Sequence, residues 1–338
     1  MENVTLPDYN DATYNYAEDT EVINPKSFHI IQIISIIFYS IFSILGITQN
    51  AQIIWIAGFK TQKTVTVLWF LNMAIADFIF DMTFPLQITE WIMDGHWLFG
   101  RVMCKVVFTI LFLNTSVSTS FLMITDVDWC MSVMCPMWSK NHRSPRLALT
   151  ISAIIWLICF ILTSPDFGSF DIVPDSENST SYCTPLYDEE DDTDTTRPQT
   201  LIIIRCFFFF LIPFLIILIR CGLTVSRSLS ICPLKVIITM VLNFFCLNFP
   251  IHSWPLLQVL NIEINPTADM VITHLVYCIA LLKSCINPSL CVSVGRHCKK
   301  HLFFLENTFK KKDGSNSDPR INQTNWAMME TEMESLNL

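Results

Sequence analysis

Six ionisable side chains lie inside otherwise apolar stretches of the chain. They are Asp77, Asp81, Asp126, Asp128, Arg205 and Lys283. Charged groups are costly to place in an apolar medium, so each needs a partner, a polar interior or a path to water. Asp126 and Asp128 lie near the end of their stretch, within reach of water, whereas Asp77 lies deep within its own. These positions are therefore the first candidates for binding or switching chemistry.

Catalytic and metal-binding patterns do not stand out in the sequence. There is no Ser and His pair, His-rich cluster or pair of catalytic carboxylates within the apolar stretches. His252 and His274 are isolated, and a metal ligand needs companions, so each is expected to line a site or an interface. No basic stripe suggests nucleic-acid binding. We expect neither an enzyme nor a protein with a metal or organic cofactor.

The elements that must position these groups are long apolar segments. Hydrophobic residues make up 52% of the 338 residues and charged residues only 15%, too few to cover a water-soluble globule. Helices satisfy their own backbone groups in lipid, and the alternation expected of barrel strands is absent. Seven segments are long enough to cross about 30 Å of hydrocarbon. They cover residues 28–59, 64–91, 102–134, 147–164, 200–224, 236–260 and 268–294.

Charge is sorted between the two sides that seven spans create. Basic residues gather in the connections on one side, which is therefore predicted to be cytoplasmic, with the amino terminus outside and the carboxyl terminus inside. The opposite side carries acidic runs before the first span and in residues 188–194. These runs suit capture of a cationic peptide or protein, although a merely solvated loop is the alternative reading. A multi-pass protein of the plasma membrane is predicted.

Two of the thirteen cysteines differ from the others in their position. Most cysteines lie inside apolar segments, where a thiol behaves as a small hydrophobe. Cys104 begins the third span and Cys183 lies in a polar loop, both on the predicted outer side, where oxidation is permitted. We therefore predict a disulfide between them. Asn3 and Asn178, also outside, are in glycosylation sequons.

Prolines at positions 85, 165, 213, 250 and 288 fall within five of the spans. Proline removes a backbone donor and frees a carbonyl, so kinks are expected there. A kinked bundle below acidic loops could serve a receptor, a transporter or a channel. No internal repeat is evident, which counts against most transporters.

Four regions are expected along the chain. Residues 1–27 form an acidic extracellular tail, and residues 28–294 form the seven-helix domain. Residues 295–305 are amphipathic, with Lys299 and Lys300 toward lipid headgroups, and predict a short helix on the membrane surface. Residues 306–338 are polar, predicted to be disordered, and offer serine and threonine sites for phosphorylation and arrestin binding.

The sequence resembles the rhodopsin-like G-protein-coupled receptors, and among them the chemoattractant group with the chemerin and formyl-peptide receptors. The resemblance runs from the first span to the predicted surface helix. The most similar stretches are GFKTQKTVTVLWFLNMAIADFIF from Gly58, HWLFG from His96, PMWSKNHRSPRLA from Pro136 and SCINP from Ser284. It implies a receptor for an extracellular peptide or small protein that signals through an inhibitory-type heterotrimeric G protein in chemotaxis or inflammation.

The resemblance also assigns roles to particular residues. Asn50, Asp77, Trp156, Pro213 and Pro250 occupy landmark positions of the family, as do Asn287 and Pro288, and Cys104 with Cys183 matches its extracellular disulfide. Arg205 matches an arginine of the binding site, where a guanidinium would bind a carboxylate or peptide carbonyls; the alternative is an internal pair with an acid such as Asp81. The ligand-binding residues we expect are Arg205, Asp81, Asn114, His252 and Asn248.

The activation motifs of the family are altered in this chain. Its D-R-Y or D-R-C sequence reads Asp128-Trp129-Cys130, so the arginine that engages the G protein is missing. The C-W-x-P and N-P-x-x-Y motifs read L-N-F-P and N-P-S-L-C, and Cys221 replaces a tyrosine. Loss of active-state contacts disfavours that state. The hypothesis that follows is a receptor that couples weakly, or a scavenging relative that binds without signalling.

Lys283 replaces an asparagine that lines a sodium site in relatives. That site would also involve Asp77, Ser118, Ser284 and Asn50. A lysine-carboxylate attraction at 4 Å amounts to about 4 kcal/mol before desolvation at an effective dielectric near 20. We therefore predict an ion pair between Asp77 and Lys283, and ligand binding that does not respond to sodium.

Overall fold

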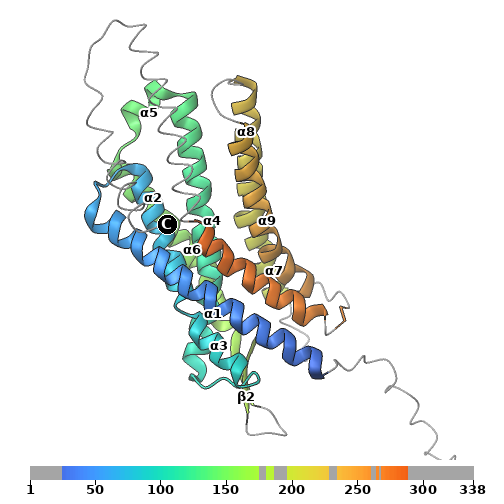
Figure 1. Ribbon diagram of the computed structural model, residues 1–338. Coiled ribbons are helices and arrows are strands. Elements are labelled where there is room, and N and C mark those ends of the chain that lie inside the picture. Colours follow the sequence, from blue (N-terminus) through green and yellow to red (C-terminus); the bar gives the residue numbers. More distant parts are fainter. Residues whose placement is uncertain are drawn as a thin grey trace, which may run out of the picture.

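The chain forms an elongated bundle of helices (Figure 1). The computed structural model describes residues 25–174, 180–185, 196–227, 234–259, 264–265 and 268–287. The acidic tail with Asn3, the sequon at Asn178, the predicted surface helix and the terminal tail lie outside these residues, apart from the last three residues of the acidic tail. Those predictions stay untested.

The predicted spans are largely helical where the structure describes them, with a break at Met82 and Thr83 in the second. Among the described residues, six segments are long and apolar enough to cross a membrane, and α9, with 26 residues, lies between the last two of them. The segments are His29–Lys60, Val65–Ile92, Gly100–Ser132, Pro145–Gly168, Thr200–Ile219 and Ala268–Asn287, which we call the final helix. Together with α9, they make the seven-helix membrane bundle that hydropathy predicted.

The element bounds follow these segments, with short irregular turns at several ends. The helices are α1 (Pro25–Trp55), α2 (Val65–Asp81), α3 (Phe84–Ile92), α4 (Gly100–Met134), α5 (Pro136–His142), α6 (Pro145–Thr163), α7 (Thr196–Cys206), α8 (Ile212–Arg227) and α9 (Leu234–Val259). The short turns are η1 (Ile56–Lys60), η2 (Ser164–Gly168) and η3 (Phe207–Leu211), and the strands are β1 (Phe170–Pro174) and β2 (Ser181–Pro185).

Local sequence explains where several helices begin. Thr64 precedes α2 and its side chain accepts a hydrogen bond from the Val67 amide at 3.3 Å. Ser144 precedes α6 and accepts from the Leu147 amide at 3.3 Å, with Pro145 in the first turn. Such side chains satisfy amide groups that have no partner within the helix.

The prolines act differently from one span to the next. Pro85 lies in the first turn of α3, just after the second span breaks at Met82 and Thr83. Pro213 follows the π-helical turn η3. This turn connects α7 to α8 without a break, so the fifth span is one continuous helix. Pro250 lies inside α9, which stays helical around it, so this proline does not end the sixth span. Neighbouring helices allow such prolines in membrane bundles.

Helix α4 lies centrally and contacts α2, α6 and α8. Buried side chains such as Phe70, Met73, Val117 and Phe121 fill the space between these helices. Trp156 of α6 donates its indole N–H to Asn72 Oδ1 at 3.0 Å, which ties α6 to α2.

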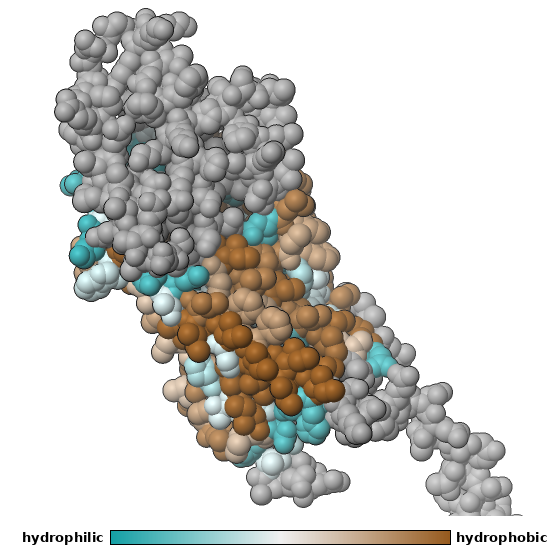
Figure 2. Space-filling view, viewed as in Figure 1, coloured by the Kyte–Doolittle hydropathy of each residue, from teal (hydrophilic) through white to brown (hydrophobic). Residues whose placement is uncertain are grey.

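The outer faces of α1 and α6 are apolar and exposed in the part of the chain that the structure describes. Exposed residues include Ile30, Ile37 and Ile44 on α1 and Leu157 and Phe160 on α6. Figure 2 shows hydrophobic side chains dominating the middle of one face, with hydrophilic residues mainly above and below. This distribution suits a surface that meets lipid tails.

A two-stranded hairpin that sequence reasoning did not predict covers one end of the bundle. Strands β1 and β2 pair antiparallel, with Ile172 opposite Cys183. The loop before α4 docks on the hairpin, since the Trp97 amide donates to Ser181 O at 2.8 Å. We call this the hairpin end; α5 lies at the opposite end (Figure 1).

Candidate functional site

Asp77 of α2 lies at the centre of a buried polar cluster. Asn114 of α4 donates to Asp77 Oδ1 at 2.8 Å, and Asn287 of the final helix donates to Asp77 Oδ2 at 2.8 Å. Asn287 also donates to Ser118 Oγ at 3.0 Å. Hydrogen bonds from two other elements, α4 and the final helix, hold a carboxylate that is 1% exposed. Asn114 is part of this cluster, and its predicted role in ligand binding stays a prediction.

Asp81, one helical turn further along α2, forms a second part of the same cluster. Its Oδ2 accepts from Ser284 Oγ at 2.7 Å and from Asn50 Nδ2 at 3.2 Å. Asn50 also donates to Ser284 Oγ at 3.0 Å. Asp81 is fully buried, and its role in ligand binding stays a prediction. It joins α1, α2 and the final helix.

Gly46 of α1 makes room for Asp81. A Cβ atom at position 46 would lie 2.4 Å from Asp81 Oδ2 and 2.7 Å from its Cγ. Those distances are far inside van der Waals contact. The carboxyl group therefore occupies space that only glycine leaves free.

Lys283 does not form the predicted ion pair with Asp77. Its ammonium donates to Thr119 Oγ1 at 3.0 Å, and no side-chain contact within 4 Å joins it to Asp77 in the part of the chain described. Thr119 in turn donates to Asn248 Oδ1 at 3.1 Å. A hydrogen-bonded chain thus links the final helix, α4 and α9. Asn248, predicted to bind ligand, is 1% exposed and belongs to this link.

Arg205 sits nearer the hairpin end and is paired inside the protein. Its Nη2 donates to Asp166 Oδ1 at 2.5 Å, and its guanidinium carbon lies 4.2 Å from the centre of the Phe112 ring. Both charged side chains are buried, at 8% and 1% exposure. An internal pair was the alternative reading of Arg205, but the acid is Asp166 of η2 and not Asp81.

The two histidines have different surroundings. His274 Nδ1 and the Tyr39 hydroxyl are 2.7 Å apart, and the His274 ring lies 4.0 Å from that of Trp91. His252 is buried, with its ring 5.9 Å from that of Phe210. His274 is therefore part of an interface between α1, α3 and the final helix, whereas His252 of α9 lies close to Phe210 of η3.

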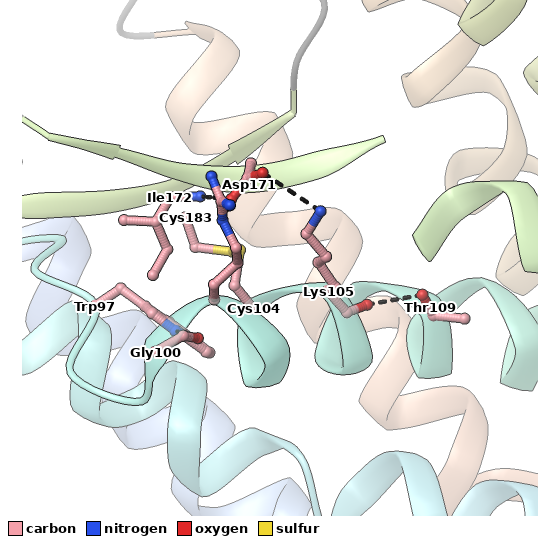
Figure 3. Close-up of a disulfide and its surroundings, with 9 residues drawn as sticks. Trp97, Gly100, Cys104, Lys105, Thr109, Asp171, Ile172 and Cys183 are labelled. Carbon is pink, nitrogen blue, oxygen red and sulfur yellow. Dashed lines mark hydrogen bonds and ion pairs between the residues drawn. A yellow bond between two sulfur atoms is a disulfide. The ribbon is translucent and has the colours of Figure 1, made fainter. Parts of the chain in front are cut away.

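The predicted disulfide between Cys104 and Cys183 is present and fastens the hairpin to α4. Their Cα atoms are 5.7 Å apart (Figure 3). Asp171 of β1 lies above the start of α4, where its carboxylate is 2.5 Å from Arg101 Nε and 3.3 Å from Lys105 Nζ. Desolvation acts to raise the pKa of Asp171, but the Ile172 amide and the two cations outweigh it and hold that pKa below its ordinary value.

Asp128, near the α5 end of α4, is paired with Arg143. Arg143 Nε donates to Asp128 Oδ1 at 2.9 Å and its Nη2 donates to Oδ2 at 2.8 Å, a bidentate pair. Arg143 Nη2 also contacts Thr66 Oγ1 of α2. Cys130 is buried, and the side chain of Trp129 lies outside the described residues. Asp126 is 6% exposed, so its expected access to water is wrong.

Sequence reasoning found most of these residues but missed two that organise them. Thr119 gave no signal because threonine is common in apolar helices and carries no charge. Asp166 directly follows Pro165 at the end of the fourth apolar segment, and this position is typical of a loop residue. An acid at a span boundary that faces a buried arginine is the signal that could have identified it.

The chain matches known proteins along most of its length. Residues 49–290 match the family described as "7 transmembrane receptor (rhodopsin family)". The sequence is 34% identical to human "Chemerin-like receptor 1" (Homo sapiens) over 339 residues, covering 93% of this chain and 88% of that protein.

Two other relatives carry different names. The chain is 33% identical to zebrafish (Danio rerio) "C5a anaphylatoxin chemotactic receptor 1", over 86% of both chains. It is 30% identical to mouse (Mus musculus) "Formyl peptide receptor 2", over 87% of this chain and 90% of that protein.

Proposed function

Because this chain belongs to the rhodopsin family of seven-transmembrane receptors, we propose that it is a chemoattractant-type receptor for an extracellular peptide or small protein. The names of its relatives support this ligand class, since they refer to chemerin, C5a and formyl peptides. Membership of a receptor family argues against the transporter or channel alternative and against an enzyme.

The proposed setting is the plasma membrane, with the hairpin end outside the cell. The basic residues of the α5 end, such as Lys140, Arg143 and Arg146, support a cytoplasmic location for that end. A disulfide at the hairpin end suits the oxidising exterior. Asn3 and Asn178 would then carry glycans, and the terminal tail would be available to arrestin.

The observation that carries the ligand proposal is the arrangement of Arg205, Asp166 and Phe112 near the hairpin end. A charged pair and an aromatic ring lie side by side below a disulfide-fastened hairpin. Guanidinium groups bind carboxylates and carbonyls, and aromatic rings receive apolar side chains, so together they suit a peptide. We place ligand recognition at this site.

The signalling partner we propose is an inhibitory-type G protein bound at the α5 end. One observation favours a second candidate, a receptor that binds and internalises ligand with little G-protein activation. Trp129 stands where the family has arginine, and Asp128 is held in a bidentate pair by Arg143. Tryptophan has one N–H donor and no positive charge, so it cannot replace a guanidinium.

The experiment that tests this proposal measures binding and signalling in the same cells. Labelled chemerin-like and formylated peptides are applied to cells with known surface expression, and arrestin recruitment, internalisation and inhibition of cyclic AMP are recorded. Binding with cyclic-AMP inhibition supports the signalling receptor. Binding and internalisation without it supports the second candidate, and saturable binding of no peptide contradicts both.

A further inference from the structure

The positive charge of Arg205 is neutralised from within the chain. Asp166 lies 39 positions away in sequence, and its carboxylate accepts a hydrogen bond from Arg205 Nη2. Both side chains are almost completely buried. Phe112 covers the guanidinium at 4.2 Å. The guanidinium is thus held between an aromatic ring and a carboxylate of the protein itself.

This pair is geometrically less complete than the other arginine-aspartate pair of the structure. Arg143 grips both oxygens of Asp128 through Nε and Nη2. Arg205 bonds only Asp166 Oδ1, and Oδ2 is buried with no hydrogen-bond partner among the described residues. Among the described residues, the Arg205 Nε donates only within its own helix, to Leu201 O at 3.4 Å. A bidentate pair gains energy and specificity that a single hydrogen bond does not.

The elements that carry the pair also differ from rigid helix. Asp166 lies on η2, a five-residue 3₁₀ turn that leads from α6 toward β1. Arg205 lies at the end of α7, directly before the π-helical turn η3. Short 3₁₀ and π turns inside or beside helices are often found at functional sites.

We propose that Asp166 is a tethered occupant of the anion site formed by Arg205 and Phe112, and that a ligand carboxylate binds there by replacing it. Two carboxylates in contact repel each other in a buried setting, so the incoming anion and Asp166 exclude one another. Asp166 thereby sets the specificity of the site. A peptide with a free carboxyl group can displace it, whereas an uncharged carboxamide gains too little from Arg205.

The site can be tested without knowing the natural ligand, by rescue with acetate. Thermal unfolding is followed for the purified full chain in nanodiscs, for the wild type, Asp166→Ala and Asp166→Ala/Arg205→Gln, in acetate or chloride of equal ionic strength. Asp166→Ala leaves a buried guanidinium unpaired and is expected to lower the unfolding midpoint by roughly 10 °C in chloride. Acetate should recover at least half of that loss.

The wild type and the double variant provide the matched controls. Acetate should not shift the wild type, whose site is filled, or the double variant, which has no guanidinium to bind it. An equal acetate effect on all three proteins, or an Asp166→Ala midpoint unchanged from the wild type, would overturn the proposal. If Asp166→Ala does not fold, Asp166→Asn keeps the shape of the side chain, and the same pattern is expected with a smaller shift.

Only the last step, displacement by a ligand, rests on the proposed receptor function. Failure of the acetate rescue would contradict the proposal that Asp166 occupies an anion site, and would leave the receptor proposal intact. Success of the rescue together with no peptide binding would keep the anion site and contradict the receptor proposal. The two proposals therefore fail separately.

Discussion

The ammonium group of Lys283 donates a hydrogen bond to Thr119 Oγ1 at 3.0 Å, in the interior of the bundle and 164 positions away in sequence. Thr119 in turn donates a hydrogen bond to Asn248. The buried Lys283 cation is therefore connected through Thr119 to α4 and α9. Lys283 and Asp77 are not in direct contact, but both are buried, and their partners Thr119 and Asn287 lie on or contact the same stretch of α4. The positive charge that this region requires is therefore supplied by the chain.

Sodium is expected to have no effect on the unfolding temperature of the wild type, because the Lys283 ammonium already compensates Asp77. Lys283→Asn removes that charge and offers an amide oxygen in its place. We expect this variant to be stabilised by sodium relative to choline, by a few degrees, in thermal unfolding of the purified protein.

The control for the sodium experiment is the double variant Asp77→Asn/Lys283→Asn, which lacks the carboxylate and should lose the sodium response. A sodium-dependent unfolding temperature in the wild type would show that Lys283 does not replace the ion.

Gly46→Ala should destabilise the protein, because the added methyl would lie 2.4 Å from Asp81 Oδ2. Overpacking of a filled interior costs about 1–3 kcal/mol, and here the carboxyl group would also have to leave Asn50 and Ser284. Thermal unfolding and surface expression measure the loss.

Gly222→Ala in α8 provides the matched control, since nothing lies within 4 Å of its Cβ position. Alanine there should be neutral or stabilising by up to about 1 kcal/mol through helix propensity. Equal behaviour of the two alanine variants would contradict the close contact between Gly46 and Asp81.

The pairing of Asp171 with Arg101 and Lys105 should contribute to stability down to acidic pH. Because the folded state holds the pKa of Asp171 below its ordinary value of 3.8, the contribution is fully present above that value and is lost as the pH falls through the folded pKa. The unfolding temperature of the wild type should exceed that of Asp171→Asn by a constant margin from neutral pH to about pH 5, and the margin should shrink below the ordinary pKa.

A margin between the wild type and Asp171→Asn that shrinks between pH 7 and pH 5 would contradict this pairing. Replacing both cations, in Arg101→Gln/Lys105→Gln, should lower the unfolding temperature at neutral pH and remove the same acid dependence.

Trp129→Arg is expected to raise inhibitory-type G-protein activation several-fold over the wild type. The substitution restores a planar guanidinium beside Asp128 at the α5 end, where the family carries its arginine. Inhibition of cyclic AMP, with and without peptide and normalised to surface expression, measures the gain.

Trp129→Lys is the matched control for this gain, because it adds charge without the forked donors and should recover less activity. A wild type that already signals as strongly as Trp129→Arg would show that the altered motif does not limit coupling.

Hydropathy alone was enough to predict the seven spans and their order, because each apolar block must be helical in lipid. The bounds shifted by only a few residues, as at Leu234, where α9 begins two residues before the predicted start. The break after Asp81 and the hairpin were harder to predict. A strand of five residues with one disulfide cysteine gives too short a pattern to distinguish from a loop.

In the candidate site, the charged residues could be predicted from the sequence, but their partners could not. Asp77, Arg205 and Lys283 stand out in the sequence because they are charged in an apolar setting. Their partners come from other helices, and the choice of Thr119 over Asp77 for Lys283 depends on helix rotation and side-chain direction. Local sequence determines neither the rotation of a helix nor the direction of a side chain toward another helix. Asp166 was missed for the same reason, since its role exists only once η2 lies against Arg205.

Peptide binding to cells that display the wild type, Arg205→Ala or Arg143→Ala tests the receptor proposal most directly. At least one chemerin-like or formylated peptide should bind the wild type saturably, with affinity reduced tenfold or more by Arg205→Ala and little by Arg143→Ala, at matched surface expression. Binding that is unchanged by Arg205→Ala, or no saturable binding of any of these peptides, would contradict the account.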